Sequence, residues 1–442
     1  MTAVIPTSQL KPPRSSGAAP AKLFVETTTR CNLNCVMCVK QNKGSEVCEG
    51  DFQPELFAGI VSALPRLEAL VLNGIGEPLL NPHLESFIRT AKSSMPTGSW
   101  VGFQTNGVLM TPEKAYSLVE AGLDKVCISI DAIVPEHFRQ LREGGEIESV
   151  ERAFGALNTA MEQCGRPDVQ IGVEFVAMRE NIRELPSTLE WAAGRGARFA
   201  IVTHVLPYDE RHAEQALFSN VSDEALALFE EWRATAAADG IDIRHYRQAI
   251  WRFRRSRDEQ AVVDAVEAMK ADGERRGIML DMKKLFQLEQ QQLDETAGLF
   301  AAARDVADRC GIDLRLPEVT LSEKRKCSFV EEGSAFVSWN GDVSPCYFLW
   351  HRYDCFASGW SQTVRPKVFG NVGRDDILTI WNSTEYASFR SGVLAYDYPS
   401  CASCGLSPCD YLTAEEFEQD CHISSVPCGS CLWCTGVFQC LR

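Results

Sequence analysis

Six short apolar segments alternate with helical patterns between residues 22 and 207, and this alternation limits the folds open to the chain. Each segment is rich in Val, Ile, Leu or Phe and has the length of a buried strand. Strands in series with helices between them form parallel sheets, which are open or curled into a barrel. Periodicity alone leaves the curl undecided. The predicted strands are residues 23–27, 69–73, 100–105, 125–131, 169–176 and 199–205.

Helical patterns fill the gaps between these strands. Proline stands near four of the expected helix starts, where its missing N–H costs nothing. The chain is therefore predicted to be an α/β protein of six βα units. The predicted helices are residues 55–64, 84–92, 113–121, 150–162 and 185–193.

Three cysteines, Cys31, Cys35 and Cys38, directly follow the first predicted strand at C-x3-C-x2-C spacing. Three thiolates can hold one [4Fe–4S] cube and leave its fourth iron without a protein ligand. An iron of that kind can bind a small molecule and pass an electron to it. The alternative is zinc, which usually takes two Cys or His pairs. Cys48 is the next cysteine and stands without a partner, so the spacing favours the cluster.

This cysteine loop resembles that of the radical S-adenosylmethionine (radical SAM) enzymes. The resemblance implies a partial (β/α)6 barrel that binds a [4Fe–4S] cluster and S-adenosylmethionine (SAM). It also implies the chemistry: SAM is cleaved reductively, and the 5′-deoxyadenosyl radical abstracts hydrogen from a substrate. Cys31, Cys35 and Cys38 would be the catalytic cluster ligands.

Polar residues follow several of the predicted strands, and ligands bind at the carboxyl ends of parallel strands. In the radical SAM resemblance, Gly76 and Glu77 match the end of a Gly-Gly-Glu motif that contacts the methionyl amino group. Ile75 stands where the first glycine of that motif would be. The other expected SAM contacts are Asn106, then Ser129 and Asp131, which match residues that hold the ribose or carboxylate, and Arg142, for the carboxylate.

Structural roles are open for three of these residues. Glu77 could simply be an acid at a helix N-terminus, where the helix dipole favours it. Asn106 with the glycine after it could be only a turn. Arg142 could be an ordinary surface charge.

The tail holds eleven of the chain's 18 cysteines, from Cys327 to Cys440. Cys327, Gly341 and Cys346 are spaced C-x13-G-x4-C, which resembles the opening of a SPASM domain, the auxiliary-cluster module of many radical SAM maturases. The resemblance implies one or two auxiliary [4Fe–4S] clusters. The middle motif is one residue short and lacks its close fourth cysteine, so the ligand pairing stays open. The candidate ligands are Cys327, Cys346, Cys401, Cys404, Cys409, Cys421, Cys428, Cys431 and Cys440.

Structural zinc on the paired tail cysteines is the alternative to auxiliary clusters. The final segment, residues 427–440, resembles a branch of SPASM proteins regarded as metalloenzyme maturases. Members of that branch are linked with tungsten- or molybdenum-type aldehyde oxidoreductases, so the resemblance implies such an enzyme as partner.

Composition excludes other classes of protein. The net charge of −16 argues against sequence-independent nucleic-acid binding. No apolar run reaches the ~18 residues needed to span a membrane. The many cysteines predict a reducing, cytoplasmic location. The predicted organisation is a disordered leader (1–21), the partial barrel (22–207), a helical insertion or bridge (208–318) and a SPASM-like auxiliary iron–sulfur domain (319–442).

The predicted function is therefore that of a radical SAM enzyme that modifies a protein, a peptide or a metal cofactor, as the maturase of a metalloenzyme. Reduced ferredoxin or flavodoxin is the expected electron donor. One alternative is an enzyme that modifies ribosomal peptides, although residues 1–22 hold no evident leader-binding domain. The other alternative is a non-catalytic iron–sulfur carrier of electrons or clusters, which leaves the polar strand ends unexplained.

Overall fold

A nine-stranded sheet forms the centre of the computed structural model, which describes residues 17–441 except 43–44, 357–359, 407 and 415. Every neighbouring pair of strands is parallel except the last pair, β12–β13. All six predicted strands are confirmed. In spatial order the strands are β10 (Asp313–Arg315), β8 (Phe199–His204), β7 (Gln170–Ala177), β5 (Lys125–Ser129), β4 (Trp100–Thr105), β3 (Ala69–Val71), β1 (Lys22–Val25), β12 (Ser334–Val337) and β13 (Val343–Ser344).

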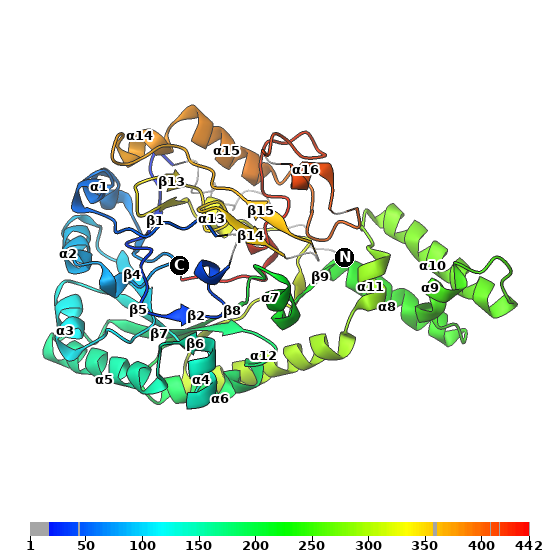
Figure 1. Ribbon diagram of the computed structural model, residues 1–442, viewed down its shortest axis with the longest axis horizontal. Helices are drawn as coiled ribbons and strands as arrows, with labels where there is room; N and C mark the ends of the chain where they lie inside the picture. Colours follow the sequence, from blue (N-terminus) through cyan, green and yellow to red (C-terminus); the bar gives the residue numbers. More distant parts are fainter. Residues whose placement is uncertain (1–16, 43–44, 357–359, 407, 415, 442) are drawn as a thin grey trace, which may run out of the picture.

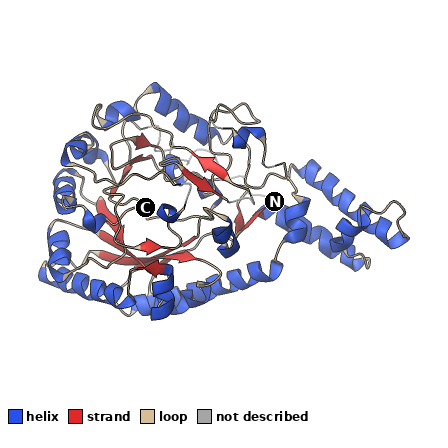
Figure 2. Ribbon diagram, viewed as in Figure 1, coloured by secondary structure: helices blue, strands red, loops and turns tan. Residues whose placement is uncertain are grey.

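The sheet curves, and helices cover its outer face (Figures 1 and 2). This arrangement confirms the predicted α/β class with a parallel, partly closed sheet. The predicted helix at 55–64 is divided at Gly59, the C-cap of α1, where a side chain would overlap the carbonyl group of Val372. The covering helices are α1 (Pro54–Ala58), α2 (Leu84–Ser94), α3 (Pro112–Glu120), α4 (Pro135–Leu141), α5 (Ile147–Gln163) and α6 (Leu185–Ala193).

The tail contributes to the same sheet. β12 pairs in parallel with β1, with Lys22 opposite Ser334, and turns back into β13 at Gly341, whose φ is +91°. Asn340 and Gly341 thus form the turn of a β-hairpin. The remaining tail elements are α13 (Ser328–Glu331), β14 (Tyr353–Cys355), β15 (Gln362–Val364), α14 (Ile377–Trp381), α15 (Thr384–Ala395) and α16 (Asp410–Thr413).

The segment predicted as a helical insertion contributes to two hydrophobic cores. Its last helix, α12 (Gln290–Cys310), buries Phe300, Ala303 and Val306 in the core of the main body. Helices α8 to α11 surround a second core and project from the main body (Figure 1); they are called the helical arm below. Besides β10 of the main sheet, the elements of the segment are α7 (Glu210–Gln215), β9 (Ser219–Ser222), α8 (Asp223–Ala238), α9 (Tyr246–Ala249), α10 (Arg257–Arg276), α11 (Met282–Gln287), α12 and, just beyond it, β11 (Thr320–Leu321).

The C-terminal end lies within the curve of the sheet (Figure 1). The backbone N–H of Gln439 donates to Thr203 Oγ1 over 3.2 Å, and Leu441 is buried. Most of the predicted leader, residues 1–16, lies outside the described residues. Among the helices of the described ranges, none combines the length and apolar character that crossing a membrane requires.

Candidate active site and cysteine clusters

The loop that carries Cys31, Cys35 and Cys38 is held at two points. Its short central strand β2 (Asn34–Cys35) pairs antiparallel with β6 (Arg142–Glu143), so that Cys35 lies opposite Arg142. Just before Cys31, the Arg30 guanidinium forms an ion pair with Asp51, Nη2 to Oδ2 2.6 Å. All three cysteines are partly accessible. The loop therefore presents three thiols in a defined conformation beside the ends of the strands.

Gly76 is needed where the loop after β3 meets the cysteine loop. The backbone N–H of Gly76 donates to Thr28 O (3.1 Å), and that of Glu77 donates to Arg30 O (2.8 Å). A Cβ at Gly76 would overlap both of these carbonyl oxygens. Backbone atoms cannot move aside as a flexible side chain can. Gly76 therefore permits the close approach of the two loops.

We expect Gly76→Ala to push the cysteine loop out of place. Overpacking of this kind costs about 1–3 kcal/mol in the free energy of unfolding, and the variant should retain less iron after reconstitution. The control is Gly155→Ala in α5, where a Cβ meets nothing within 4 Å. An alanine inside a helix gains about 0.5–1 kcal/mol over glycine. Denaturant unfolding and iron per chain measure both effects, and equal behaviour of the two variants would refute the role of Gly76.

Glu77 is buried and joins the loops after β3 and β4. Its Oε1 accepts from the Leu79 N–H (3.1 Å) and Thr105 Oγ1 (2.7 Å), and its Oε2 accepts from the Asn106 N–H (2.7 Å). Burial raises the pKa of the Glu77 carboxyl, although these three donors act against the shift. The predicted contact of Glu77 with a methionyl amino group stays a prediction, because protein donors engage both oxygens here.

Asn106 extends this network to the cysteine loop. Its Nδ2 donates to Asn32 Oδ1 (2.8 Å) and lies 3.9 Å from Cys31 Sγ. Its Oδ1 accepts from the Val108 N–H (3.0 Å), the pattern of an Asx turn. The turn and the contact with the site are thus both present at this residue.

Arg142 and Asp131 form a buried ion pair, Nη2 to Oδ2 2.7 Å. Arg142 Nη1 also lies 3.8 Å from Cys35 Sγ. Asp131 Oδ1 accepts from the Val176 N–H at 2.8 Å. Burial raises the pKa of the Cys35 thiol, and the Arg142 charge acts against this rise. Arg142 is not an ordinary surface charge, since only 6% of its surface is exposed.

The predicted site residues therefore come together in two linked groups around the cysteine loop. One runs from Glu77 through Asn106 to Cys31, and the other from Asp131 through Arg142 to Cys35. Nitrogen donors and a cation beside sulfur favour the thiolate form that binds iron. Ser129 is half-buried at the end of β5, opposite Glu174 of β7, and its role stays a prediction.

Two buried acids in the predicted strand segments were not among the predicted site residues. Burial raises the pKa of Glu174 to about 7, and a hydrogen bond from Gln104 acts against the shift. Glu26, fully buried after β1, accepts from His351 Nε2 (3.0 Å) and the Ile75 N–H (3.1 Å). Glu26 thus connects the tail to the loop that holds Gly76. The available signal was a glutamate inside each apolar strand segment.

The tail cysteines fall into two sets, and the thiols within each set interact electrostatically with one another. In the first set, burial and then the neighbouring Cys409, Cys404 and Cys421 raise the pKa of Cys401 to about 12. In the second set, burial and then Cys431, Cys327 and Cys346 raise the pKa of Cys428. Cys434 adjoins the second set, since its Sγ donates to Cys431 O. Cys440 interacts with Tyr347 and lines a cavity together with Cys434.

Within the described ranges, no three His, Cys, Asp or Glu side chains lie close enough together to bind one metal ion. The thiolates of an iron–sulfur cube bind different irons and so stand further apart than the ligands of one ion.

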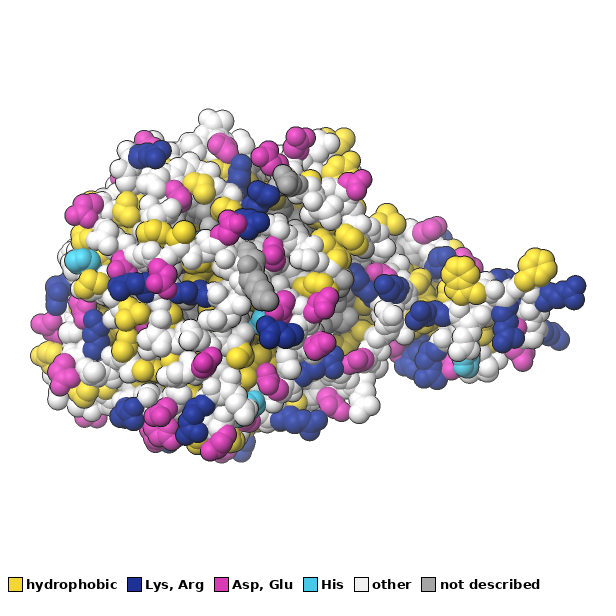
Figure 3. Space-filling view, in the orientation of Figure 1, with side chains coloured by type: hydrophobic (Ala, Val, Ile, Leu, Met, Phe, Trp, Pro, Cys, Tyr) yellow, Lys and Arg dark blue, Asp and Glu magenta, His cyan; other side chains and the backbone are white. Residues whose placement is uncertain are grey.

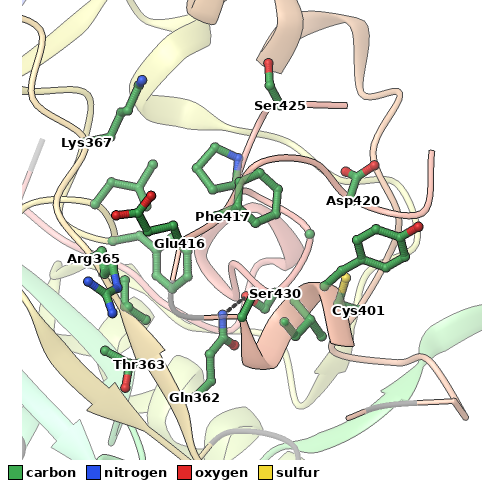
Figure 4. A pocket seen from close by; sticks show the side chains of 18 of the residues that line it. Gln362, Thr363, Arg365, Lys367, Cys401, Glu416, Phe417, Asp420, Ser425 and Ser430 are labelled. Carbon is green, nitrogen blue, oxygen red and sulfur yellow. Dashed lines mark hydrogen bonds between the residues drawn. The ribbon is translucent and has the colours of Figure 1, made fainter. Parts of the chain in front are cut away.

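A cavity of about 310 Å³ adjoins Cys401 in the tail (Figure 4). Arg365, Lys367 and Glu416 line it together with aromatic side chains such as Phe417. Gln362 Nε2 donates to Ser430 Oγ across its floor, over 2.9 Å. The cavity forms part of the surroundings of the first cysteine set.

Two family models match the chain. The model of the radical SAM superfamily covers residues 25–192, and that of SPASM, an iron–sulfur cluster-binding domain, covers residues 327–405. These matches confirm both predicted resemblances. They imply the predicted cofactors as well: a [4Fe–4S] cluster with SAM in the first domain, and auxiliary iron–sulfur clusters in the second.

Individual relatives differ in how much of the chain they cover. The tungsten-containing aldehyde ferredoxin oxidoreductase cofactor-modifying protein of Pyrococcus furiosus is 27% identical over 95% of this chain and 96% of its own length. A probable GTP 3′,8-cyclase of Methanococcus maripaludis is 30% identical over 41% of this chain and 58% of its own. The crystal structure of Streptococcus suis SuiB bound to precursor peptide SuiA covers 88% of this chain and 70% of that one, with 11% identity and a TM-score of 0.49.

Proposed function

This chain is a radical SAM enzyme with a SPASM iron–sulfur domain, and we propose that it modifies the metal cofactor of a tungsten- or molybdenum-type aldehyde oxidoreductase. The observation that carries the proposal is the extent of the match to the Pyrococcus protein, 95% of this chain. A match of that length includes the helical arm and the tail. The cyclase match covers only 41% of the chain, so it supports no more than a shared barrel.

The cysteine loop has the donors that the first cluster requires. When bound, the [4Fe–4S] cluster supplies the electron that cleaves SAM, and the 5′-deoxyadenosyl radical produced removes hydrogen from the substrate. Cys31, Cys35 and Cys38 would hold the cube. Arg142 places a positive charge beside Cys35, and Asn106 directs its amide toward Cys31. Because these side chains are fixed by buried partners, the site is preorganised.

The first tail set supplies four thiols, which is the number that full ligation of a cube requires, and the second supplies four besides Cys434, which interacts with three of them. We assign Cys401, Cys404, Cys409 and Cys421 to one auxiliary cluster. The mutual interactions of their thiols support this grouping. The second cluster would take Cys327, Cys346, Cys428 and Cys431, whose interactions support it in the same way. Cys440 stays a predicted ligand without a place in either set.

Electrons for SAM cleavage must come from a low-potential carrier, and reduced ferredoxin or flavodoxin is the proposed donor. Three sites that depend on thiolates require a reducing compartment, so we place the enzyme in the cytoplasm.

The test is activation of an oxidoreductase in vitro. The aldehyde oxidoreductase of the same organism is produced in cells that lack this enzyme, and is then incubated anaerobically with the reconstituted enzyme, SAM and dithionite. We expect aldehyde oxidation to appear only in the complete mixture. An oxidoreductase that stays inactive would refute the proposal. Activation without SAM would instead identify the chain as a carrier of clusters or electrons.

A further inference from the structure

The helical arm is a small folded unit with its own core. Phe229 of α8, Val266 and Met269 of α10 and Leu285 of α11 are buried there, apart from the core of the main body. The arm projects from the main body, and its far end carries the loop between α9 and α10 (Figure 1). We call residues 247–257, which comprise this loop and its flanks, the tip. A rigid arm holds the tip away from the rest of the protein.

The tip exposes two large aromatic side chains. Trp251 is 89% exposed and Phe253 is fully exposed, at 101%. Their exposure does not come from a loose loop. Arg255 donates to Ala249 O (2.9 Å) and Ile250 O (3.0 Å), and Ser256 forms a capping box at the start of α10. These hydrogen bonds order the loop while both rings stay in water, where they bury no apolar surface and so add nothing to the stability of the fold.

The tip is also strongly basic in an acidic protein. Its residues, 247–257, include five arginines and no acid, whereas the whole chain has a net charge of −16. Within the described residues, Arg247, Arg254 and Arg257 form no ion pair or side-chain hydrogen bond. Arg257 is the first residue of α10, where the helix dipole disfavours a cation. These three charges therefore contribute little to the stability of the arm.

Figure 3 shows hydrophobic and basic side chains side by side on the arm. Exposed tryptophan and arginine together are the residue types that dominate binding energy at protein interfaces. An acidic surface would complement the three unpaired arginines.

We propose that the tip docks onto an acidic surface of the oxidoreductase whose cofactor this enzyme modifies. This inference rests on the proposed function, because it assumes that the substrate is held by a protein partner. Trp251 and Phe253 would insert into the partner, while Arg247, Arg254 and Arg257 would steer the encounter. The arm would then position the partner beside the barrel without contributing to SAM cleavage.

The test measures binding of the full-length, reconstituted enzyme to the purified cofactor-free oxidoreductase by biolayer interferometry. Trp251→Ser/Phe253→Ser should weaken the Kd at least about thirtyfold, as expected for the loss of a central anchor. Arg247→Glu/Arg254→Glu/Arg257→Glu should weaken it about tenfold or more and flatten its dependence on salt. The control variant reverses the charge of three other exposed, unpaired arginines by the substitutions Arg66→Glu, Arg304→Glu and Arg374→Glu. This variant should change the Kd less than twofold.

Uncoupled cleavage of SAM serves as a check of folding, and every variant should retain it. Equal binding and equal activation by tip variants and wild type would overturn the docking proposal while the proposed function stands. A wild type that neither binds nor activates the oxidoreductase would overturn both. Loss of binding in the control as well would show that general charge, not the tip, drives association. Tip-dependent binding to anionic vesicles or duplex DNA, with none to the oxidoreductase, would also overturn it.

Discussion

Replacing Cys31, Cys35 and Cys38 together with alanine should reduce formation of 5′-deoxyadenosine from SAM to background. The three thiols lie on one loop anchored by β6 and Asp51. Replacing all three leaves that loop without a thiolate ligand for the first cluster. The measurement is product formed by anaerobically reconstituted protein with dithionite. Iron should fall by about four atoms per chain, which is one cube.

The matched control removes three thiols elsewhere. Cys48→Ala, Cys164→Ala and Cys310→Ala together should leave product formation and iron content close to those of the wild type. Cys48 is exposed, and Cys164 and Cys310 are half-buried far along the chain from the loop. If the variant without Cys31, Cys35 and Cys38 forms as much 5′-deoxyadenosine as this control variant, SAM is cleaved at another cluster.

The sequence predicts best those features whose cause is local. Each predicted strand is a run of apolar residues, and the sheet contains all six of them. The turn at Gly341 was predictable because only glycine readily adopts its positive φ. The cysteine loop was predictable for the same reason, since its three ligands are adjacent in the chain.

Pairings between distant segments left no such signal. β12 lies against β1 although more than 300 residues separate Lys22 from its partner Ser334. The short apolar sequence of β12 could pair with many different strands. Which strand it pairs with is decided only when the whole sheet assembles. The helix α12 is similar: its composition predicts a helix, but not that Phe300 packs into the main core.

In the site, the residue types were predictable and their partners were not. Asp131 and Arg142 were both named as SAM contacts, but their mutual ion pair depends on the β2–β6 pairing. Glu174 was hidden in a strand that reads as apolar. The two tail sets draw cysteines from separate segments, so spacing could supply the pool of ligands and not the pairing.

The Arg142–Asp131 pair yields the largest expected effect on stability. Arg142→Met keeps most of the side chain's length but leaves a buried carboxylate without its cation. Breaking a buried pair in this way costs about 3–5 kcal/mol, because the remaining charge is uncompensated. Both side chains are nearly inaccessible, 8% and 0% exposed, so water cannot take the place of the guanidinium. Chemical denaturation of the reconstituted protein measures the loss.

Two further variants separate the charge effect from simple loss of packing. In Arg142→Met/Asp131→Asn, the amide oxygen can still accept from the Val176 N–H, and no charge is left buried. Most of the lost stability should return in this double variant. Arg89→Met breaks the exposed pair with Glu120, 58% and 55% accessible, and should cost less than about 1 kcal/mol. If the double variant is as unstable as Arg142→Met, packing rather than charge explains the loss. If it recovers stability without recovering SAM cleavage, Arg142 also serves the chemistry beside Cys35, from which its Nη1 lies 3.8 Å.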